Sequence, residues 1–248
     1  MATADFGDQR LNQRARVLLE TLGEKPSLSI PAACGGGTET VAAYRFFNHE
    51  NATFEQVLQP HRQATVERLG EHPVLLLLQD TSELDYSSQP AIQGLGRTRT
   101  PKGYGAHLHP LLAVTPEGLC LGLVAAKLWS RTAEETRSPT AAKQRPLEEK
   151  ESFRWLEMYR HACQLAGEVP QTQVITVADR ESDLYELFLE YQQRSGPKAE
   201  WLVRAAQIRS LLEEAPAHRK LWSRLRTSPS LGEIEFELPS TAKRPARR

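Results

Sequence analysis

The stretch Val74-Leu75-Leu76-Leu77-Leu78, which lies between Pro73 and Asp80, decides the fold of this chain. A continuous apolar run of this length predicts a strand that is covered on both faces. A second run, Gln173-Val174-Ile175-Thr176-Val177-Ala178, is rich in β-branched residues and is followed by another acid, Asp179. The two runs therefore predict buried strands that each present an aspartate at the carboxyl end.

The rest of the chain after residue 80 predicts a mixed sheet with crossover helices. The expected elements are a hairpin of 108–114 and 119–126 around the turn 115–118, helices over 148–166 and 184–191, and strands over 173–178 and 200–205. Gly167 is expected to end the first of these helices. Loops are expected over 85–106 and 130–147, and a short strand over 233–237. The order strand, hairpin, helix, strand, helix, strand is typical of an α/β fold.

The first 72 residues predict a small domain made only of helices. Apolar residues between Leu11 and Leu22 recur at spacings of three and four, and Gly23 and Pro26 end this helix. A loop rich in small residues follows, and Thr38 is expected to cap a second helix that runs to Phe47. A third helix is expected over 54–69.

Length, composition and charge set the broad class. The chain has 248 residues, of which 40% are hydrophobic and 25% charged, with a formal net charge of zero. The charge is unevenly spread, because 204–248 carry ten Lys or Arg and five acids, a net +5 that leaves the rest at −5. A basic segment suits nucleic acid, although it is often only a solvated tail. Three separated cysteines and the lack of a long apolar segment predict a soluble protein of the cytoplasm with no membrane partner.

Asp80 and Asp179 are the strongest candidates for chemistry. If their strands are neighbours, the two carboxylates converge beyond the carboxyl ends of the sheet. Close carboxylates repel each other unless a cation lies between them, so the pair predicts a site for Mg²⁺ or Mn²⁺ and, with paired metals, phosphoryl chemistry. The alternative is that each aspartate only caps the turn that follows it. A second pair, His107 and His109, can belong to a transition-metal site or fill ordinary polar positions.

Six ordered blocks of sequence resemble the DDE transposases of the insertion-sequence-four group, most closely the Tn-five type. The blocks are Gly7-Asp8-Gln9-Arg10 with Arg14, Ala43-Tyr44-Arg45-Phe46, Leu78-Gln79-Asp80-Thr81-Ser82, Glu149-Lys150-Glu151-Ser152 with Trp155-Leu156, Asp179-Arg180-Glu181-Ser182-Asp183, and Trp201-Leu202-Val203-Arg204. They cover nearly the whole chain.

The resemblance implies a helical DNA-binding domain over 1–72, an RNase H-like catalytic core over 73–206, and part of a basic β insertion over 207–248. It implies that Asp80 and Asp179 are catalytic metal ligands and that Arg180 and Asp183 support the second motif. In such enzymes two Mg²⁺ ions activate water to nick a transposon end and then activate the 3′-hydroxyl that attacks target DNA, which is DNA transposition and recombination.

The resemblance also implies double-stranded DNA as partner, both transposon ends and target. Contacts to DNA are expected from basic and aromatic side chains in the helical region and in the loop before the hairpin, namely Arg10, Arg14, Tyr44, Arg45, Arg99 and Lys102. A surface charge without a special role is the alternative for these arginines. A homodimer on DNA is a further implication.

The sequence departs from the family pattern after Asp179. Only 69 residues follow, and none spells the family's Tyr-Arg-Glu-Lys-like signature that carries the third carboxylate. Glu233, Glu235 and Glu237 alternate with apolar residues, which is typical of the solvent face of a short strand. We therefore expect a truncated transposase with an impaired metal site and without the C-terminal dimerisation region. The competing hypothesis is a non-catalytic protein that occupies transposon ends and inhibits transposition.

Overall fold

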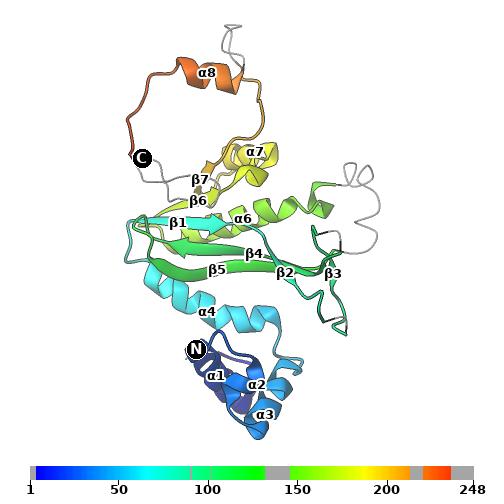
Figure 1. Cartoon of the computed structure of the whole chain (residues 1–248). Helices are drawn as coiled ribbons and strands as arrows, with labels where there is room; N and C mark the ends of the chain where they lie inside the picture. Colours follow the sequence, from blue (N-terminus) through cyan, green and yellow to red (C-terminus); the bar gives the residue numbers. More distant parts are fainter. Residues whose placement is uncertain (1–3, 90, 101, 132–145, 213–219, 236–248) are drawn as a thin grey trace. The chain divides into compact units, whose positions relative to one another are not determined.

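The computed structural model describes residues 4–89, 91–100, 102–131, 146–212 and 220–235 of the chain (Figure 1). The chain divides into two compact units, Met1–Ala205 and Ala206–Arg248. The first unit holds a helical region and a mixed sheet with its helices. The described part of the second holds one short helix, α8 (Leu221–Thr227). None of the helices in the described ranges is both long enough and apolar enough to cross a bilayer.

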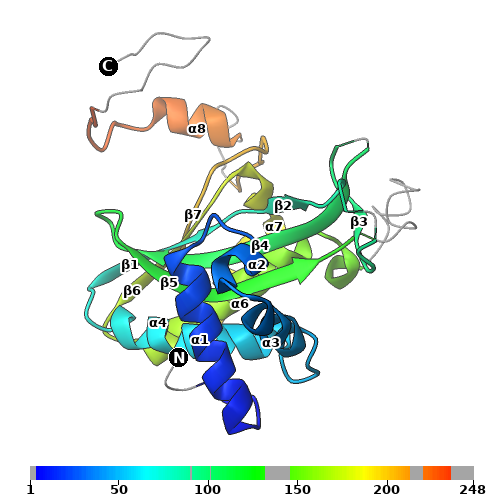
Figure 2. The same cartoon turned by 60° about the horizontal axis from the view of Figure 1, so that its bottom comes forward.

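The helical region begins with three helices that share a small core. They are α1 (Gln9–Glu24), α2 (Ile30–Cys34) and α3 (Gly37–Phe47), which gather into one cluster (Figure 2). Phe6, Leu18 and Phe46 are the largest buried side chains of this core, and the Phe6 and Phe46 rings meet edge to face at 5.3 Å. Of these three helices, α1 and α3 match the helices expected from the sequence closely.

Helix α2 is a correction, because a loop was expected there. Ser29 precedes the helix, Pro31 lies in its first turn, and Gly35 ends it with a φ of 69°. Proline fits a first helical turn and glycine fits a left-handed cap, but five residues carry too little periodicity to be recognised. Thr38 is a second correction, since Gly36 occupies the N-cap and the helix therefore begins two residues earlier than expected.

Helix α4 (Phe54–Leu69) begins with a complete capping box, in which Thr53 and Gln56 satisfy each other's backbone N–H groups. The helix runs along the edge strand β5 (Cys120–Trp129). Arg68 donates hydrogen bonds to the Leu121 carbonyl, and the Leu123 N–H donates to Nε2 of His61. These contacts satisfy backbone groups that an edge strand otherwise exposes.

The sheet is mixed and has seven strands among the described residues. Besides β5 they are β1 (Val74–Gln79), β2 (Ser82–Asp85), β3 (Gly96–Arg97), β4 (Tyr104–Val114), β6 (Gln173–Ala178) and β7 (Glu200–Val203). Strand β1 pairs antiparallel with β4 and parallel with β6, and β6 pairs parallel with β7. The predicted hairpin is confirmed as β4 and β5, and its turn contains Gly118 at a φ of 91°.

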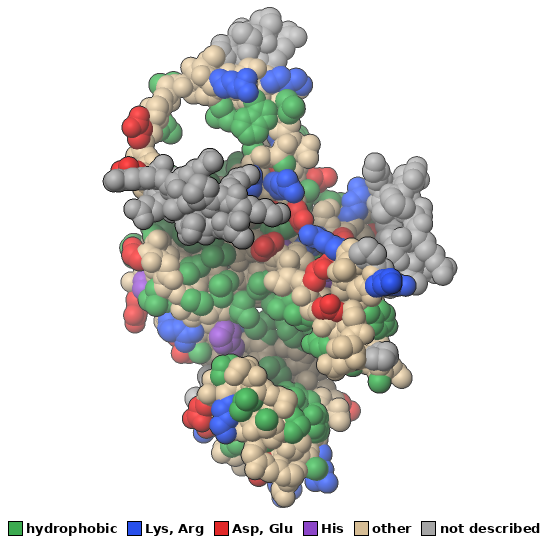
Figure 3. All heavy atoms as spheres, viewed as in Figure 1, with side chains coloured by type: hydrophobic (Ala, Val, Ile, Leu, Met, Phe, Trp, Pro, Cys, Tyr) green, Lys and Arg blue, Asp and Glu red, His purple; other side chains and the backbone are tan. Residues whose placement is uncertain are grey.

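In the described ranges, the helices that pack on the sheet lie on one of its faces. These are α4, α6 (Phe153–Glu168) and α7 (Tyr185–Gln193), and they bury Leu75, Leu77 and Val174 in one core. The opposite face is more exposed: Leu78 is 37% and Leu202 is 61% exposed. In Figure 3 hydrophobic side chains gather over the sheet. Among the described residues, the expectation that β1 is covered on both faces is therefore confirmed for one face and wrong for the other, where Val74 and Leu76 are half-buried and Leu78 is exposed.

Several boundaries also differ from expectation. The expected loop 85–106 contains β3 and the start of β4, and α6 continues past Gly167 to Glu168. Gly167 instead lets Pro197 approach closely, since a Cβ there would lie 3.0 Å from the Pro197 ring. Described residues 233–235 form no strand, while 236–237 and most of the expected loop 130–147 lie outside the described residues.

Candidate metal site and DNA-binding surface

The two aspartates lie next to each other across parallel strands. Gln79, the last residue of β1, pairs with Ala178, the last residue of β6. Asp80 and Asp179 are the next residues along these two strands, and both are exposed. Because side chains alternate along a strand, both are placed on the side of Leu78 and away from the helix-covered face. The predicted convergence at the carboxyl edge is thus supported by the strand register.

Pro110 of β4 lies opposite the point where β1 ends. Gln79 pairs with Leu111 and Ser82 pairs with Leu108, so β1 and β2 follow β4 in one continuous register. This register places Asp80 opposite Pro110, which has no N–H to donate. The strand is interrupted there, so Asp80 lies outside the hydrogen-bonded ladder.

Each aspartate also caps the turn that follows it, as the alternative interpretation expected. Oδ1 of Asp80 accepts the Thr81 N–H at 2.7 Å, and Oδ1 of Asp179 accepts the Glu181 N–H at 2.8 Å. The second turn is a 3₁₀ helix, Arg180–Ser182. Within the part of the chain that the structure describes, the other oxygen of each carboxylate accepts no hydrogen bond. Capping therefore leaves one oxygen of each aspartate available.

The supporting residues of the second motif differ in their surroundings. Arg180 is exposed in the turn, whereas Asp183 is 7% exposed at its end. Glu181, which was not singled out as a site residue, makes the ion pairs of this turn. It binds Arg99 at 3.0 Å and Arg154 at 2.8 Å. Arg99, a predicted DNA contact, is thus brought beside the second aspartate motif although it is 82 residues away in sequence.

A directed chain of hydrogen bonds runs beneath Asp80 on the helix-covered side. Nε of Arg154 donates to Oγ1 of Thr81 at 2.9 Å. Nε2 of His109 faces Oε1 of Gln79 at 3.3 Å, and because an amide oxygen only accepts, the ring proton is assigned to Nε2. With this tautomer the Thr81 hydroxyl donates to Nδ1 of His109, 2.8 Å away. This series of hydrogen bonds links α6, the end of β1 and the middle of β4.

Burial keeps His109 neutral. Its side chain is fully buried against the edge of Trp155, with the ring centroids 4.5 Å apart. This burial, followed by the charges of Arg154 and Lys127, lowers the pKa of His109 from 6.5 to about 3. A neutral ring is what its acceptor role toward Thr81 requires.

His107 lies on the same covered face of β4 and stacks on Trp129 at 5.2 Å. Its Nε2 lies 3.4 Å from Oε1 of Glu83, but the angle is too poor for a hydrogen bond. Burial, more than the nearby charge of Arg131, lowers the pKa of His107. Both histidines of the predicted pair are therefore buried polar groups on the covered face of β4.

No complete metal-ligand set is found in the described ranges. There, no cluster of three or more His, Cys, Asp or Glu side chains has the geometry to hold an ion. Of the candidate third acids, Glu233 and Glu235 lie in the second unit and Glu237 lies outside the described residues.

Of the predicted DNA contacts in the helical region, Arg10 and Arg14 lie together. They line a hollow of about 650 Å³ with Gln9, Gln13, Val17 and Glu39. Arg14 binds Glu39 at 2.5 Å and so ties α1 to α3, whereas Arg10 is exposed. Tyr44 and Arg45 are exposed on α3, and Lys102 is exposed before β4.

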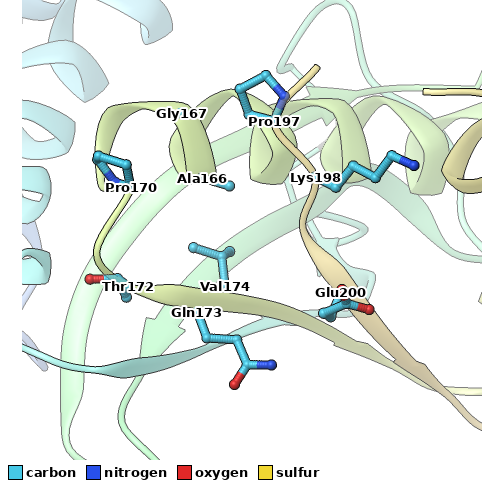
Figure 4. Close-up of a pocket in the computed structure, with 9 residues that line it drawn as sticks. All are labelled: Ala166, Gly167, Pro170, Thr172, Gln173, Val174, Pro197, Lys198 and Glu200. Atoms are coloured by element: carbon cyan, nitrogen blue, oxygen red, sulfur yellow. The ribbon is translucent and has the colours of Figure 1, made fainter. Parts of the chain in front are cut away.

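A separate pocket lies far along the strand from Asp179. It has a volume of about 390 Å³ and is formed by the end of α6, the start of β6 and the segment before β7 (Figure 4). Its lining includes Gln173, Lys198 and Glu200. Because Gln173 begins β6 and Asp179 follows its end, the pocket and the aspartates lie at opposite ends of this strand.

Sequence reasoning missed Arg154, Thr81 and Glu181. The available signal was an arginine between Phe153 and Leu156 on the apolar face of an amphipathic helix, where a charge needs a buried partner.

One comparison bears on the helical region. Residues 1–52 match the family model described as transposase DNA-binding. This range contains α1, α2 and α3 and four of the predicted DNA contacts, Arg10, Arg14, Tyr44 and Arg45. The N-terminal region of this chain is therefore a transposase DNA-binding domain.

Proposed function

We propose that this protein binds double-stranded DNA through its N-terminal helices and holds Mg²⁺ or Mn²⁺ between Asp80 and Asp179 to cut and join transposon DNA. The observation that carries the metal site is the register of β1 and β6, which brings the two aspartates to adjacent positions. The family match over residues 1–52 supports DNA as the partner.

The strand order supports an RNase H-like core. The order is β5-β4-β1-β6-β7, with β4 antiparallel to β1 and with β5, β6 and β7 parallel to it. Crossover helices α6 and α7 connect the parallel strands. In open α/β sheets ligands bind beyond the carboxyl ends of such strands, which is where both aspartates lie.

The donor set fits magnesium. Mg²⁺ takes hard oxygen ligands, keeps several waters, and is commonly bound by one or two carboxylates together with substrate phosphates. Asp80 and Asp179 offer one oxygen each that is not engaged in capping. When bound, the ion supplies charge stabilisation for phosphoryl transfer and lowers the pKa of water. The protein side chains hold and orient the ion, and the arginines of the helical region hold the DNA.

The metal site is tested with Mn²⁺ as the probe, because its electron paramagnetic resonance signal is lost on binding. We expect Asp80→Asn and Asp179→Asn each to weaken binding at least tenfold, since each removes a charged ligand of a two-carboxylate site. Glu149→Gln, an exposed acid in the η1 turn (Leu147–Glu149), is the control. Equal Mn²⁺ affinity in wild type and both aspartate variants contradicts the proposed site.

DNA binding is tested by fluorescence anisotropy with a mixed-sequence duplex over a range of salt concentrations. Arg10→Gln is expected to weaken binding and to reduce the slope of log affinity against log salt by about one, which is the loss of one phosphate contact. Arg16→Gln is a matched control, because Arg16 is exposed on the same helix but does not line the hollow. If both variants bind as wild type does, the hollow is not the DNA surface.

A second function is favoured by one observation. The described residues offer two carboxylates at the strand ends and no group of three ligands. A protein that binds transposon ends without cutting them needs no third carboxylate. Undiminished DNA binding in the presence of a chelator, together with no nicking of a supercoiled plasmid in Mg²⁺ or Mn²⁺, supports this alternative over catalysis.

A further inference from the structure

Arg154 joins the two aspartate motifs although it belongs to neither. It is the second residue of α6, and its side chain is 7% exposed. Nε binds Oγ1 of Thr81 at 2.9 Å, and Nη2 binds Oε2 of Glu181 at 2.8 Å. Thr81 follows Asp80 directly, and Glu181 lies two residues after Asp179. One guanidinium therefore reaches both loops that carry the aspartates.

The rest of the Arg154 side chain is also held. Nη1 donates to the Glu151 carbonyl at 2.7 Å, and the guanidinium carbon lies 5.3 Å from the Trp155 ring and 5.7 Å from the Trp129 ring. Contacts in three directions and aromatic rings nearby leave one orientation for this planar group. A flexible lysine has no such fork, so it cannot reproduce both contacts.

Glu181 strengthens the connection to the second motif. Its carboxylate accepts from Arg99 at both oxygens and from Arg154 at Oε2, while its own N–H is the donor that Asp179 accepts. Thr81 acts in the same way at the first motif, because its hydroxyl binds Arg154 and its N–H binds Asp80. In both loops, the residue held by Arg154 is the residue that orients the aspartate.

We propose that Arg154 is a positioning residue that fixes the loops of Asp80 and Asp179 in the arrangement that lets both carboxylates hold one divalent cation. The binding of a cation by the two carboxylates depends on the proposed function, whereas the fixing of the two loops by Arg154 does not depend on it. Partners that orient metal ligands commonly account for a 10- to 100-fold change in metal affinity.

The test compares Arg154→Lys with Arg160→Gln. Arg160 lies on the same helix and also binds an acid on another element, Glu190 of α7 at 2.7 Å, but it touches neither aspartate loop. Hydrogen exchange of the metal-free proteins measures the order of residues 80–83 and 180–183, and Mn²⁺ titration measures affinity. Thermal melts show how much each change destabilises the whole protein. Thr81→Val, which removes only the hydroxyl that Arg154 binds, tests the connection from its other end.

We expect Arg154→Lys and Thr81→Val to speed exchange in the aspartate loops and to weaken Mn²⁺ binding at least about tenfold, with Arg160→Gln unchanged in both. Unchanged loop exchange in Arg154→Lys overturns the proposal, and so does an equal increase in Arg160→Gln at a similar melting temperature. If wild type binds no Mn²⁺ while Arg154→Lys still loosens both loops, the positioning by Arg154 stands and the metal site of the proposed function falls.

Discussion

At the scale of single residues, the donor and acceptor roles of the polar groups beneath Asp80 depend on one another. Arg154 can only donate, so the Thr81 hydroxyl accepts from it, and Nδ1 of a His109 ring protonated on Nε2 accepts from Thr81. A proton added to Nδ1 of His109 removes the acceptor of the Thr81 hydroxyl and so breaks this hydrogen bond. The neutral state of one histidine is thus coupled to the order of the loop that carries the first aspartate.

This coupling predicts an acid-sensitive fold. The pKa of His109 is lowered to about 3 in the folded protein, mainly by burial, while in the unfolded chain it is near 6.5. The unfolded state therefore binds more protons between these values, and stability is lost as the pH falls from 6.5 towards 3. We expect this histidine to contribute up to about 1.4 kcal/mol per pH unit to that loss.

Urea unfolding of wild type and His109→Gln at pH 7, 6, 5 and 4 measures this contribution. The variant is expected to be less stable at pH 7, where it has an imperfect hydrogen-bonding partner, but to lose less stability on acidification. Parallel curves of unfolding free energy against pH for the two proteins would show that His109 is not the group responsible.

At the scale of elements, the sequence predicted the strands that carry the aspartates because their apolar runs are long and bounded. It predicted that the first strand ends before Asp80, but it did not predict that Pro110 lies opposite Asp80, since this follows only when β1 and β4 pair. Arg154 was missed for the same reason. Its partners Thr81 and Glu181 are 73 and 27 residues away, and no local pattern connects them.

Strand β5 depends on Gly122 for its contact with α4. Gly122 has a φ of 132°, and a Cβ there would lie 2.4 Å from Oγ1 of Thr65. We expect Gly122→Ala to lower the free energy of unfolding by roughly 2 kcal/mol or more, from backbone strain and overlap with α4. Chemical denaturation measures the change.

Gly23→Ala is the matched control for this prediction. Gly23 lies inside α1 with no heavy atom within 4 Å of an added Cβ, so alanine there is expected to raise stability by up to about 1 kcal/mol. A neutral Gly122→Ala would mean that β5 and α4 are not packed as closely as the structure places them.

At the scale of the whole molecule, the helices of the first unit protect only one side of the sheet. The neighbours Leu77 and Leu78 point to opposite sides, at 0% and 37% exposure. We expect Leu77→Ala to cost about 2–5 kcal/mol, because it opens a cavity in the shared core of β1, β4 and α6. Leu78→Ala is expected to cost about 1 kcal/mol, because much of the removed surface is already in water.

Variants of Leu78 distinguish an effect on stability from an effect on DNA binding at the exposed face of the sheet. Leu78 lies two residues before Asp80 on the face to which alternation directs both aspartates, so a DNA strand that approaches them passes over it. We therefore expect Leu78→Ala to lower the melting temperature by only a few degrees, and Leu78→Glu to weaken DNA binding by placing a negative charge beside the phosphates. Equal destabilisation by Leu77→Ala and Leu78→Ala would show that both faces are buried, and DNA binding by Leu78→Glu at wild-type affinity would place the DNA elsewhere.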